Sequence, residues 1–379
     1  MKIILFINSL SGGGGERVFV QLANEWAKYE NIEVHLIVGS DFGPNKSLLS
    51  DGVKLHSLSP KCSNISILYG SFLKLLPLLL KIQPDIILST LDLSNSINVL
   101  ISPIYKFIKK EKVIIVTREA NILSTNGVVP NHRSLSNFII NKVYQKFIYN
   151  SNLIIANSPD TRLDIINIRK VINNKIVFLP NPVLMTEPKF EPLPQKTHSS
   201  TIKLISIGRL TRQKNYELSL KIIYELKLKG YSISYDIYGT GEELDNLQDL
   251  AKKLDIEDIV CFKGYKNNIS HNMHQYDAFL IMSKWEGFGN VIVEALSNGL
   301  PVISSNCRGG PSFILSENYL GSMHDESNIN DICYSIIKTI SQDTDDISRK
   351  KRIMYSKKFL VSHVAKEYLD IILSVKHEK

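Results

Sequence analysis

The sequence predicts an α/β protein made of two doubly wound domains, each with a parallel β-sheet between layers of helices. Three observations support this prediction. The chain has 379 residues, which is more than one hydrophobic core usually organises. Short β-branched runs alternate with helical periods along its whole length. This rhythm stops and restarts around residues 181–200, whose prolines are typical of a linker.

Each domain is expected to contain several strands that the sequence reveals directly. In the first domain, residues 1–180, the predicted strands are 2–7, 33–38, 85–89, 112–116 and 152–156. In the second domain, residues 201–355, they are 202–207, 233–238, 259–262, 278–282 and 301–304. Residues 356–379 are expected to hold a C-terminal helix that packs back towards the first domain, because apolar residues recur there at helical spacing.

Composition limits the class of protein. Apolar residues make up 44% of the chain and charged residues 22%, as in a globular protein. Four cysteines are scattered without a C-x-x-C pair, which argues against a zinc site or a disulfide framework. The most apolar stretch, residues 72–82, is too short for a membrane span, and no signal peptide is evident. We therefore expect a cytoplasmic protein.

The net charge of +8 arises in the first half of the chain. Residues 1–180 hold 20 Lys and Arg against 12 Asp and Glu, whereas residues 181–379 hold 25 of each. This excess suits a diphosphate-bearing acceptor or an anionic membrane surface, which predicts a peripheral location on the inner face of the cytoplasmic membrane. A merely solvated basic face is the alternative. No RNA motif or zinc finger accompanies the charge, so nucleic acid is not an expected partner. The clustered lysines are Lys106, Lys109, Lys110, Lys112, Lys142 and Lys146.

Two loops that follow predicted strands carry anion-binding features. Residues 12–15 are glycines where the first strand ends and a helix begins, so backbone N–H groups can approach an anion closely. A dinucleotide fingerprint would need a glycine at the position of Arg17, and a purely structural turn is a further alternative. After strand 202–207, Arg209 and Lys214 emerge at the carboxyl edge of the second sheet, where both suit a diphosphate. Two solvated loop cations are the alternative there.

A third feature is the segment 283–303, which predicts a loop, a helix and a strand. Glu286 lies in the loop, and Asn290 is a candidate cap for a helix that carries Glu294 in its first turns and ends at Gly299. The loop carboxylate can reach sugar hydroxyls, and Glu294 can hydrogen-bond ribose hydroxyls. The backbone amides between the two glutamates face the phosphates.

With these motifs the sequence resembles the retaining glycosyltransferases of family 4, which have the GT-B fold and a Glu-x7-Glu motif that matches Glu286 and Glu294. The resemblance spans nearly the whole chain. It implies that Arg209 and Lys214 are catalytic: they would hold the donor diphosphate and stabilise charge on the departing nucleotide. Glu286 would be a third catalytic residue, in contact with the donor sugar, and Glu294 would hold the ribose. Further donor contacts are expected at Gly14, Gly15, Gly208, Gly239, Gly264, Tyr265, Gly287, Phe288, Gly289, Asn290 and Val291.

The sequence departs from the family pattern in two places. Many members have a histidine near the donor sugar in the first domain, but the segment V-T-R-E-A-N has none. Arg118, Glu119 and Asn121 occupy that neighbourhood and are candidates for the acceptor or sugar side, although a structural salt bridge is the alternative for Glu119. His132 is interpreted as a surface loop residue. Phe313 stands where relatives often have a glutamate, which puts donor contacts from its loop in doubt.

No metal and no cofactor are expected; the nucleotide sugar is a co-substrate. Asp343 and Asp345 form the one Asp-x-Asp motif, in a polar stretch that predicts a loop. His271 and His274 have no carboxylate cluster beside them.

The leading hypothesis is a retaining glycosyltransferase that moves a hexose or N-acetylhexosamine from a UDP-sugar to a glycan acceptor. The basic first domain predicts that this acceptor is linked to a lipid diphosphate, as in bacterial O-antigen or capsule assembly. A nucleotide-sugar epimerase of the same architecture is a second hypothesis, but it needs acid and base groups that the sequence does not show. A non-catalytic module that binds a nucleotide or a glycan is a third.

Overall fold

The computed structural model describes residues 1–59, 64–110, 112–124, 135–191, 201–266, 269–342 and 345–375, without the side chains of 64–69, 71, 72, 135–138, 270 and 271. The predictions for Cys62, His132, Asp343 and the His271 side chain lie outside the described residues. The chain divides into two compact units: Met1–Met185 with Val361–Lys379, and Thr186–Leu360. Assigning the acceptor to the first unit and the donor to the second stays a prediction.

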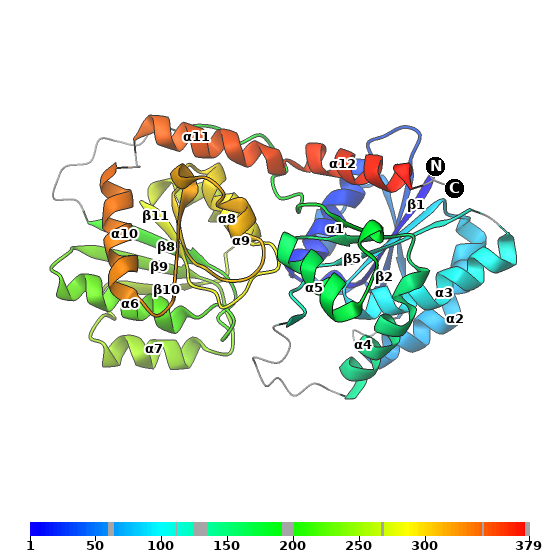
Figure 1. The fold of residues 1–379 in the computed structure, drawn as a ribbon, viewed down its shortest axis with the longest axis horizontal. Coiled ribbons are helices and arrows are strands. Elements are labelled where there is room, and N and C mark those ends of the chain that lie inside the picture. Colours follow the sequence, from blue (N-terminus) through cyan, green and yellow to red (C-terminus); the bar gives the residue numbers. More distant parts are fainter. Residues whose placement is uncertain are drawn as a thin grey trace. The chain divides into compact units, whose positions relative to one another are not determined.

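Unit 1 contains a seven-stranded parallel sheet in the order β3-β2-β1-β4-β5-β6-β7 (Figure 1). Its strands are β1 (Lys2–Ser9), β2 (Glu33–Ser40), β3 (Val53–Ser57), β4 (Ile86–Thr90), β5 (Ile114–Glu119), β6 (Leu153–Ala156) and β7 (Ile176–Phe178). Its helices are α1 (Gly14–Trp26), α2 (Asn64–Ile82), α3 (Asp92–Lys109), α4 (Leu135–Phe147), α5 (Pro159–Arg169) and α12 (Val361–Ser374).

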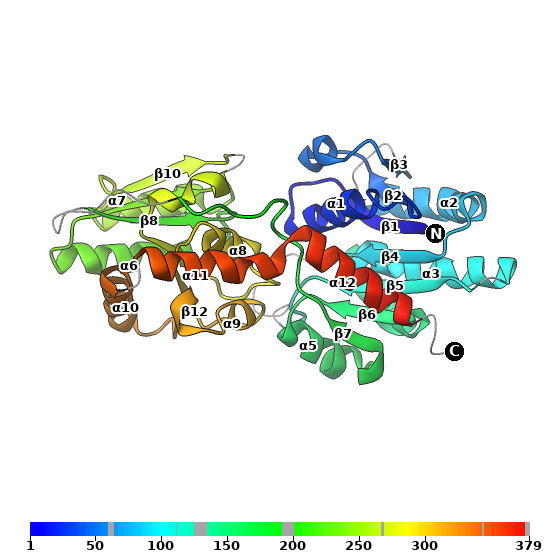
Figure 2. The same cartoon turned by 90° about the horizontal axis from the view of Figure 1, so that it is seen from above.

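The sheet of unit 1 is covered on both faces, which is why its central strands are continuous apolar runs. Ile3, Leu5 and Ile7 of β1 point to one face, where α1 and α12 pack. Ile4 and Phe6 point to the other face, where α2, α3 and α4 pack. Figure 2 shows α12 crossing the strands of this unit. This helix comes from the end of the chain, whereas the core residues it joins, such as those of β1 and α1, come from its beginning.

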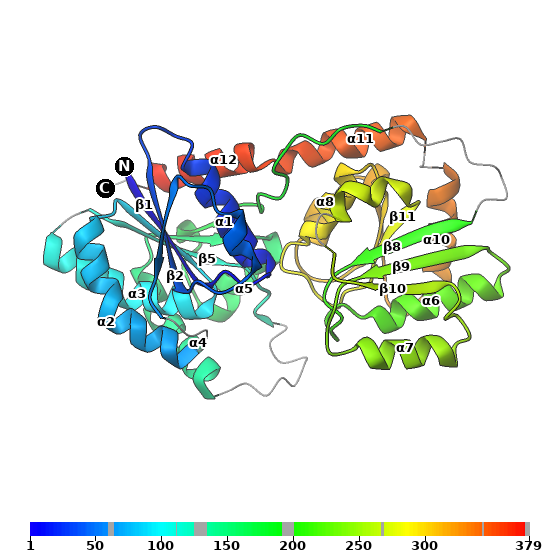
Figure 3. The ribbon, with the colours of Figure 1, turned by 180° about the vertical axis from the view of Figure 1, so that it is seen from behind.

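Unit 2 contains a six-stranded parallel sheet in the order β10-β9-β8-β11-β12-β13 (Figure 3). Its strands are β8 (Ile202–Ile207), β9 (Ile233–Tyr238), β10 (Val260–Gly264), β11 (Ala278–Ile281), β12 (Val302–Ser305) and β13 (Gly321–His324). Its helices are α6 (Tyr216–Leu228), α7 (Leu244–Lys253), α8 (Asn290–Ser297), α9 (Pro311–Ile314), α10 (Ile329–Gln342) and α11 (Asp346–Ser356). The core under α6, α7 and α10 includes Leu204, Tyr235 and Ile237.

These two sheets confirm the predicted fold class, and each has one position where the direction of winding reverses. In unit 1 this position lies between β1 and β4, and in unit 2 it lies between β8 and β11. Open α/β sheets bind ligands in the crevice that the diverging loops leave at such a reversal, beyond the carboxyl ends of the strands. The fold therefore points to the loops after β1 and β4 in unit 1 and to the loops after β8 and β11 in unit 2.

Two expected features of the helices differ from the structure. Asn290 is the first residue of α8 and does not cap it; the cap position belongs to Gly289, whose φ of 93° is left-handed. The C-terminal helix does not run on from residue 356. Instead α11 ends at Ser356, and α12 begins at Val361 after a short 3-10 turn that buries Phe359.

Candidate active site

The loops after β8 and β11 meet at the winding reversal of unit 2. Loop 208–215 follows β8, and loop 282–289 follows β11. Two backbone-linked contacts tie them together: the Lys284 amide donates to the Gln213 carbonyl at 2.8 Å, and the Gln213 side-chain amide donates to the Trp285 carbonyl at 2.8 Å. Residues 72 positions apart in sequence, Lys214 and Glu286, thereby become neighbours.

Lys214 and Glu286 form a charge pair that is largely withdrawn from solvent. The Lys214 ammonium donates to Glu286 Oε1 at 2.5 Å, and the two side chains are only 16% and 7% exposed. The buried Ser283 hydroxyl donates to the same oxygen at 2.6 Å. Within the described residues, every hydrogen bond to this carboxylate uses Oε1, which leaves Oε2 for a ligand.

The loop that carries Glu286 is held by close backbone packing against the loop after β12. Trp285 and Arg308 form an isolated parallel bridge, and the Glu286 amide donates to the Arg308 carbonyl at 3.0 Å. A Cβ on Gly309, whose φ is 126°, would lie 1.7 Å from the Glu286 carbonyl oxygen. A Cβ on Gly310 would lie 2.0 Å from the Phe288 carbonyl oxygen. Only glycine fits at either position.

Phe288 holds the same loop in place by packing its side chain into the interior of unit 2. Its ring is buried and meets the ring of Phe359 edge-on, with the centroids 5.7 Å apart. Phe313 also contacts Phe359 edge-on, at 6.4 Å. The residue that stands where relatives often have a glutamate is therefore part of an aromatic cluster that supports the loop.

Glycines also shape the loop that carries Lys214. A Cβ on Gly239 would lie 1.9 Å from the Gly208 carbonyl oxygen, and one on Gly241 would lie 2.2 Å from the Leu210 carbonyl oxygen. At Gly208 itself a Cβ would approach the Tyr216 hydroxyl and the Lys214 stem at 3.1 and 3.3 Å. The predicted donor-binding glycines at 208 and 239 thus set the path of this loop by close packing.

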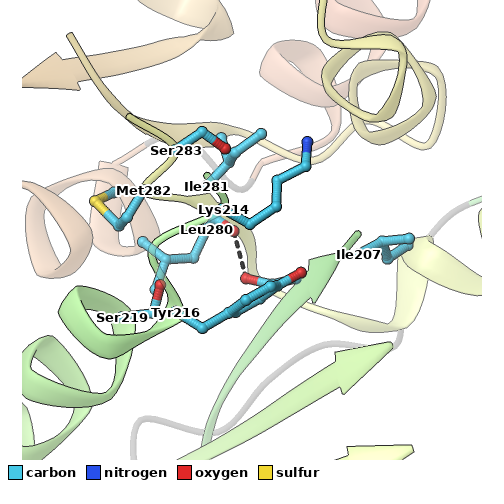
Figure 4. Close-up of a pocket in the computed structure, with 9 residues that line it drawn as sticks. Ile207, Lys214, Tyr216, Ser219, Leu280, Ile281, Met282 and Ser283 are labelled. Carbon is cyan, nitrogen blue, oxygen red and sulfur yellow. Dashed lines mark hydrogen bonds between the residues drawn. The ribbon is translucent and has the colours of Figure 1, made fainter. Parts of the chain in front are cut away.

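A small cavity of about 10 Å³ lies under Lys214, with room for about one water molecule (Figure 4). Figure 4 shows Tyr216 and Ser219 on one side of it, and Ser283 with the Lys214 amine on the other. A nucleotide sugar cannot enter a cavity of this size. The lining residues are Ser206, Ile207, Lys214, Tyr216, Ser219, Leu280, Ile281, Met282 and Ser283.

Burial also fixes the charge state of the groups around the pair. Burial, with the nearby Glu286 charge, raises the pKa of Cys307 to about 12, so this residue stays a thiol. Burial raises the pKa of Tyr216 well above its usual range, so its hydroxyl stays protonated and donates to the Gly208 carbonyl at 3.3 Å. Neither Cys307 nor Tyr216 therefore adds a charge beside the Lys214–Glu286 pair.

Helix α8 follows loop 282–289 directly and places Glu294 in its second turn. Gly287, Asn290, Val291 and Glu294 are partly exposed, while Gly289 is buried. The amides at the start of a helix lack partners within the helix, and the positive end of the helix favours an anion. The start of α8 can therefore receive phosphate oxygens.

The remaining predicted donor residues lie at the ends of β8 and β10. Arg209 is exposed and, in the part of the chain that the structure describes, makes no ion pair. Gly264 ends β10 with a φ of 65°, and nothing lies within 4 Å of the position that a Cβ would take there. Tyr265 beside it is 67% exposed. A cation and an aromatic ring are thus accessible at the carboxyl edge of the same sheet.

In unit 1 the glycine turn lies at the corresponding reversal, between β1 and β4. Helix α1 begins at Gly14, and Gly15 packs against Leu91 at the end of β4. The Glu16 carboxylate accepts a hydrogen bond from the Ser11 hydroxyl at 2.7 Å and folds back over Gly13. Gly14 and Gly15 lie where a ligand could approach, but their donor contact stays a prediction.

Arg118 and Glu119 have structural partners within unit 1. Arg118 is fully buried; its guanidinium donates to Thr90 at 3.3 Å, to Tyr368 at 3.2 Å, and to Asn181. Glu119 lies 2.8 Å from Arg169, so the structural salt bridge proposed as an alternative is present.

Burial outweighs the attraction of Arg169 and raises the pKa of Glu119 to about 7. Asn121 is exposed, in contrast to its two neighbours. The acceptor role of all three residues stays a prediction, and Asn121 is the one among them that is accessible to solvent.

Among the residues that the structure describes, the candidate metal ligands do not form a cluster. Asp345 caps α11 by accepting from the Ile347 and Ser348 amides at 2.8 and 3.0 Å. His274 lies 3.5 Å from Glu191. Among the described residues, no three His, Cys, Asp or Glu side chains stand together as metal ligands would.

Comparison with known proteins identifies the family. The profile of "Glycosyltransferase Family 4" matches residues 12–185, and that of "Glycosyl transferases group 1" matches residues 190–359. The chain belongs to the glycosyltransferases of family 4, and the protein is an enzyme of the GT-B fold.

Several proteins resemble the chain. A Campylobacter jejuni N-acetylgalactosamine-N,N'-diacetylbacillosaminyl-diphospho-undecaprenol 4-alpha-N-acetylgalactosaminyltransferase is 28% identical over 352 residues, which cover 90% of each chain. A Methanocaldococcus jannaschii glycosyltransferase is 29% identical over 252 residues, which span 60% of that protein and 64% of this chain. The structure of Anabaena HepE in complex with UDP-glucose superposes with a TM-score of 0.76 at 19% identity, covering 99% of this chain and 100% of that one.

None of the helices in the described part of the chain combines the length and apolar character needed to cross a bilayer.

Proposed function

We propose that this enzyme transfers a hexose or N-acetylhexosamine from a UDP-sugar to a glycan linked to a lipid diphosphate, with retention of anomeric configuration, in bacterial surface polysaccharide assembly. The observation that carries the proposal is the shielded Lys214–Glu286 pair at the winding reversal of unit 2, with Arg209 exposed in the same loop as Lys214. The names of related proteins support the substrates: one is solved with UDP-glucose, and another acts on a diphospho-undecaprenol-linked sugar.

Lys214 and Arg209 would act on the leaving group. An ammonium has three N–H donors, and Glu286 takes one of those of Lys214, so the others remain for phosphate oxygens. Charge grows on the UDP β-phosphate as its bond to the sugar breaks. Two cations fixed near that phosphate stabilise the transition state more than the ground state, which raises turnover. In this proposal Lys214 and Arg209 neutralise the charge on the departing phosphate, and no metal or cofactor is essential.

Glu286 and Glu294 would orient the donor. Oε1 of Glu286 is held by Lys214 and Ser283, so Oε2 can accept a hydrogen bond from a sugar hydroxyl in one fixed orientation. Glu294 is positioned one turn into α8 to accept from ribose hydroxyls, while the first amides of that helix meet the diphosphate. Gly264 and Tyr265 would meet the uracil.

In this proposal the acceptor hydroxyl attacks on the face from which UDP leaves, which retains the anomeric configuration in one step. The oxygen of the departing phosphate then takes the acceptor proton as the new glycosidic bond forms. No dedicated base is then needed among the described residues around Lys214 and Glu286. The lipid-linked acceptor would place the enzyme on the inner face of the cytoplasmic membrane as a peripheral protein.

Replacing Arg209 with Ala tests the site against a matched control in the same loop. Arg212 is exposed too, but it pairs with Glu243 at 3.2 Å and has no role in the proposed mechanism. We expect R209A to lower kcat/KM for the UDP-sugar by about 100-fold, since removing one preorganised charge donor typically costs that much. R212A should stay within about 2-fold of the unchanged enzyme, because a surface pair contributes little.

The assay follows sugar transfer to a polyprenyl-diphosphate-linked saccharide after a panel of nucleotide sugars has been ranked by thermal stabilisation. Retention is read from the anomeric configuration of the product, and transfer should persist in the presence of a chelator. An isomerised nucleotide sugar would instead indicate an epimerase. Binding of UDP without any turnover would indicate a binding module, and equal rates for both arginine variants would contradict the site.

A further inference from the structure

The outer face of α3 exposes large apolar side chains in its last turns. Phe107 is 84% exposed, Ile104 is 50% exposed and Ile108 is 51% exposed. These positions are three and four residues apart, so they form one stripe on the helix surface. Ile97 and Ile101 lie two turns earlier on the same side of α3 as Ile104 and Ile108, and they are buried against the sheet together with Tyr105. The exposed stripe is additional to the packing of unit 1.

Lysines surround this stripe. Lys106 and Lys109 lie within the same turns of α3, and Lys110 and Lys112 follow it at exposed positions. Lys106 and Lys109 are partly buried, as is common for lysines that lie along apolar surface. After Asp92, its first residue, α3 contains no acidic side chain. Between Ile104 and Lys112 the sequence holds four lysines against one acidic residue, Glu111, so the end of α3 is both apolar and basic.

The two helices beside α3 continue this character. Helices α2 and α4 both pack on α3 and contain no Asp or Glu. Leu73 on α2 is 56% exposed, and Ile139 on α4 is 52% exposed. Their exposed lysines are Lys74, Lys81, Lys142 and Lys146. One layer of helices on unit 1 therefore presents apolar side chains among positive charges.

We propose that the α3 face, formed by Ile104, Lys106, Phe107, Ile108, Lys109 and Lys110, docks on an anionic lipid surface. Phe107 and the two isoleucines enter the boundary between headgroups and acyl chains, and the lysines bind the anionic headgroups. Combined apolar burial and attraction to anionic lipid is how helices that lie in the interface attach to membranes. A second copy of the chain fits this surface poorly, because it would bring the same positive charges together.

This inference rests on the proposed function only for its biological purpose, since a lipid-linked acceptor is reached from the membrane surface. Docking itself is measured without donor or acceptor. Protein is sedimented with vesicles of phosphatidylglycerol and phosphatidylcholine, and with vesicles of phosphatidylcholine alone. We expect binding to the anionic vesicles that weakens as salt is added.

Two variants separate the apolar and the charged contributions. Phe107→Ser should weaken binding by about 10-fold or more, the equivalent of losing one buried aromatic side chain. The triple change Lys106→Gln, Lys109→Gln and Lys110→Gln should weaken it by about 100-fold, because each lysine near an anionic surface contributes roughly 5-fold.

Matched controls come from unit 2. Tyr334 is 70% exposed on α10, so Tyr334→Ser removes a comparable exposed aromatic ring. Lys229, Lys252 and Lys253 are exposed, so their triple change to Gln removes the same charge elsewhere. All variants should keep the thermal midpoint and UDP affinity of the unchanged protein, and both controls should bind vesicles normally.

Equal vesicle binding by the α3 variants and their controls would overturn the proposal. So would an absence of binding to anionic vesicles, or a dimer that Phe107→Ser dissociates. If vesicle binding follows the prediction but no sugar is transferred, the docking surface stands and the proposed function fails. If sugar is transferred but anionic vesicles are not bound, the proposed function stands and the docking surface fails.

Discussion

At the scale of single residues, the Lys214–Glu286 pair depends on both of its members. Each charge has been taken out of bulk water, and the attraction between them compensates for that loss. Glu286 is the more buried, and its carboxylate has few other partners: Ser283 supplies one hydrogen bond. Removing Lys214 leaves a buried carboxylate without its countercharge, whereas removing the charge of Glu286 leaves an ammonium that can still reach solvent.

We expect Lys214→Met to lower the free energy of unfolding of unit 2 by about 3 kcal/mol, the typical consequence of breaking a shielded pair. Adding Glu286→Gln should recover much of this loss, because the stranded charge disappears. Urea unfolding of both single variants and the double variant gives the coupling energy. Strictly additive losses would show that the pair is not coupled, and all three variants should have lost transfer activity.

The sequence allowed Lys214 and Glu286 to be predicted as site residues, since a cation after one strand and a glutamate loop after another both indicate a sheet-edge site. Their direct pairing could not be predicted, because it depends on β8 and β11 being neighbours in the sheet. Ser283 was missed as a partner of Glu286. A serine three residues before the glutamate was the available signal, but serine in a loop is too common to indicate a role.

At the scale of elements, the site is a set of loops whose backbones pack against one another. Gly309 and Gly310 lie between β12 and α9, and the Glu286 loop rests directly on their backbone. The Gly-Gly pair is visible in the sequence, but only the structure shows what it contacts. The position of the Glu286 loop therefore depends on residues that carry no functional group.

Gly309→Ala tests this dependence. Its Cβ would collide with the Glu286 carbonyl, and its φ of 126° is unfavourable for alanine, so we expect weaker donor binding and a loss of about 2 kcal/mol in stability. Gly230→Ala is the control: Gly230 has a φ of 82°, but nothing lies within 4 Å of its Cβ position. That variant should lose about 1 kcal/mol from backbone strain and keep full donor affinity. Titration with UDP and thermal unfolding measure both, and equal donor affinities would contradict the packing role.

The strands that the sequence did not reveal are all edge or near-edge elements. β3, β7 and β13 were missed, whereas the central strands were found close to their true bounds. Central strands are buried on both faces and appear as apolar runs, such as Ile3–Ile7. β13 reads Gly-Ser-Met-His and is only partly buried, and β7 is three residues long. Neither has enough pattern to distinguish it from a loop.

At the scale of the whole molecule, the chain leaves unit 1 at Met185 and returns to it at Val361. The returning helix α12 is part of the unit 1 core and contacts α1. The Trp26 indole donates to the Ala365 carbonyl at 2.9 Å, and Tyr368 is fully buried beside Arg118. Unit 1 therefore cannot be completed from the first half of the chain alone, while unit 2 is continuous in sequence.

A variant chain that ends at Leu360 tests this arrangement. The α12 side chains in the unit 1 core are Val364, Ala365, Tyr368, Leu369 and Ile372. Truncating one large core side chain typically costs about 2 to 5 kcal/mol, and a domain has only about 5 to 15 kcal/mol in total. We expect unit 1 to lose its cooperative thermal transition, whereas unit 2 keeps its own transition and the proposed UDP affinity.

Single substitutions in the full chain make the same test without a truncated end. Tyr368→Ala should destabilise unit 1 by about 4 kcal/mol, and Tyr368→Phe, which removes only the hydroxyl that accepts from Arg118, by about 1 kcal/mol. The UDP affinity should be the same in both, because the residues that hold the donor in our proposal lie mainly in unit 2. Calorimetry resolves the two transitions. If Tyr368→Ala lowered both transitions together, the two units would unfold as one, and the assignment of α12 to unit 1 alone would be wrong.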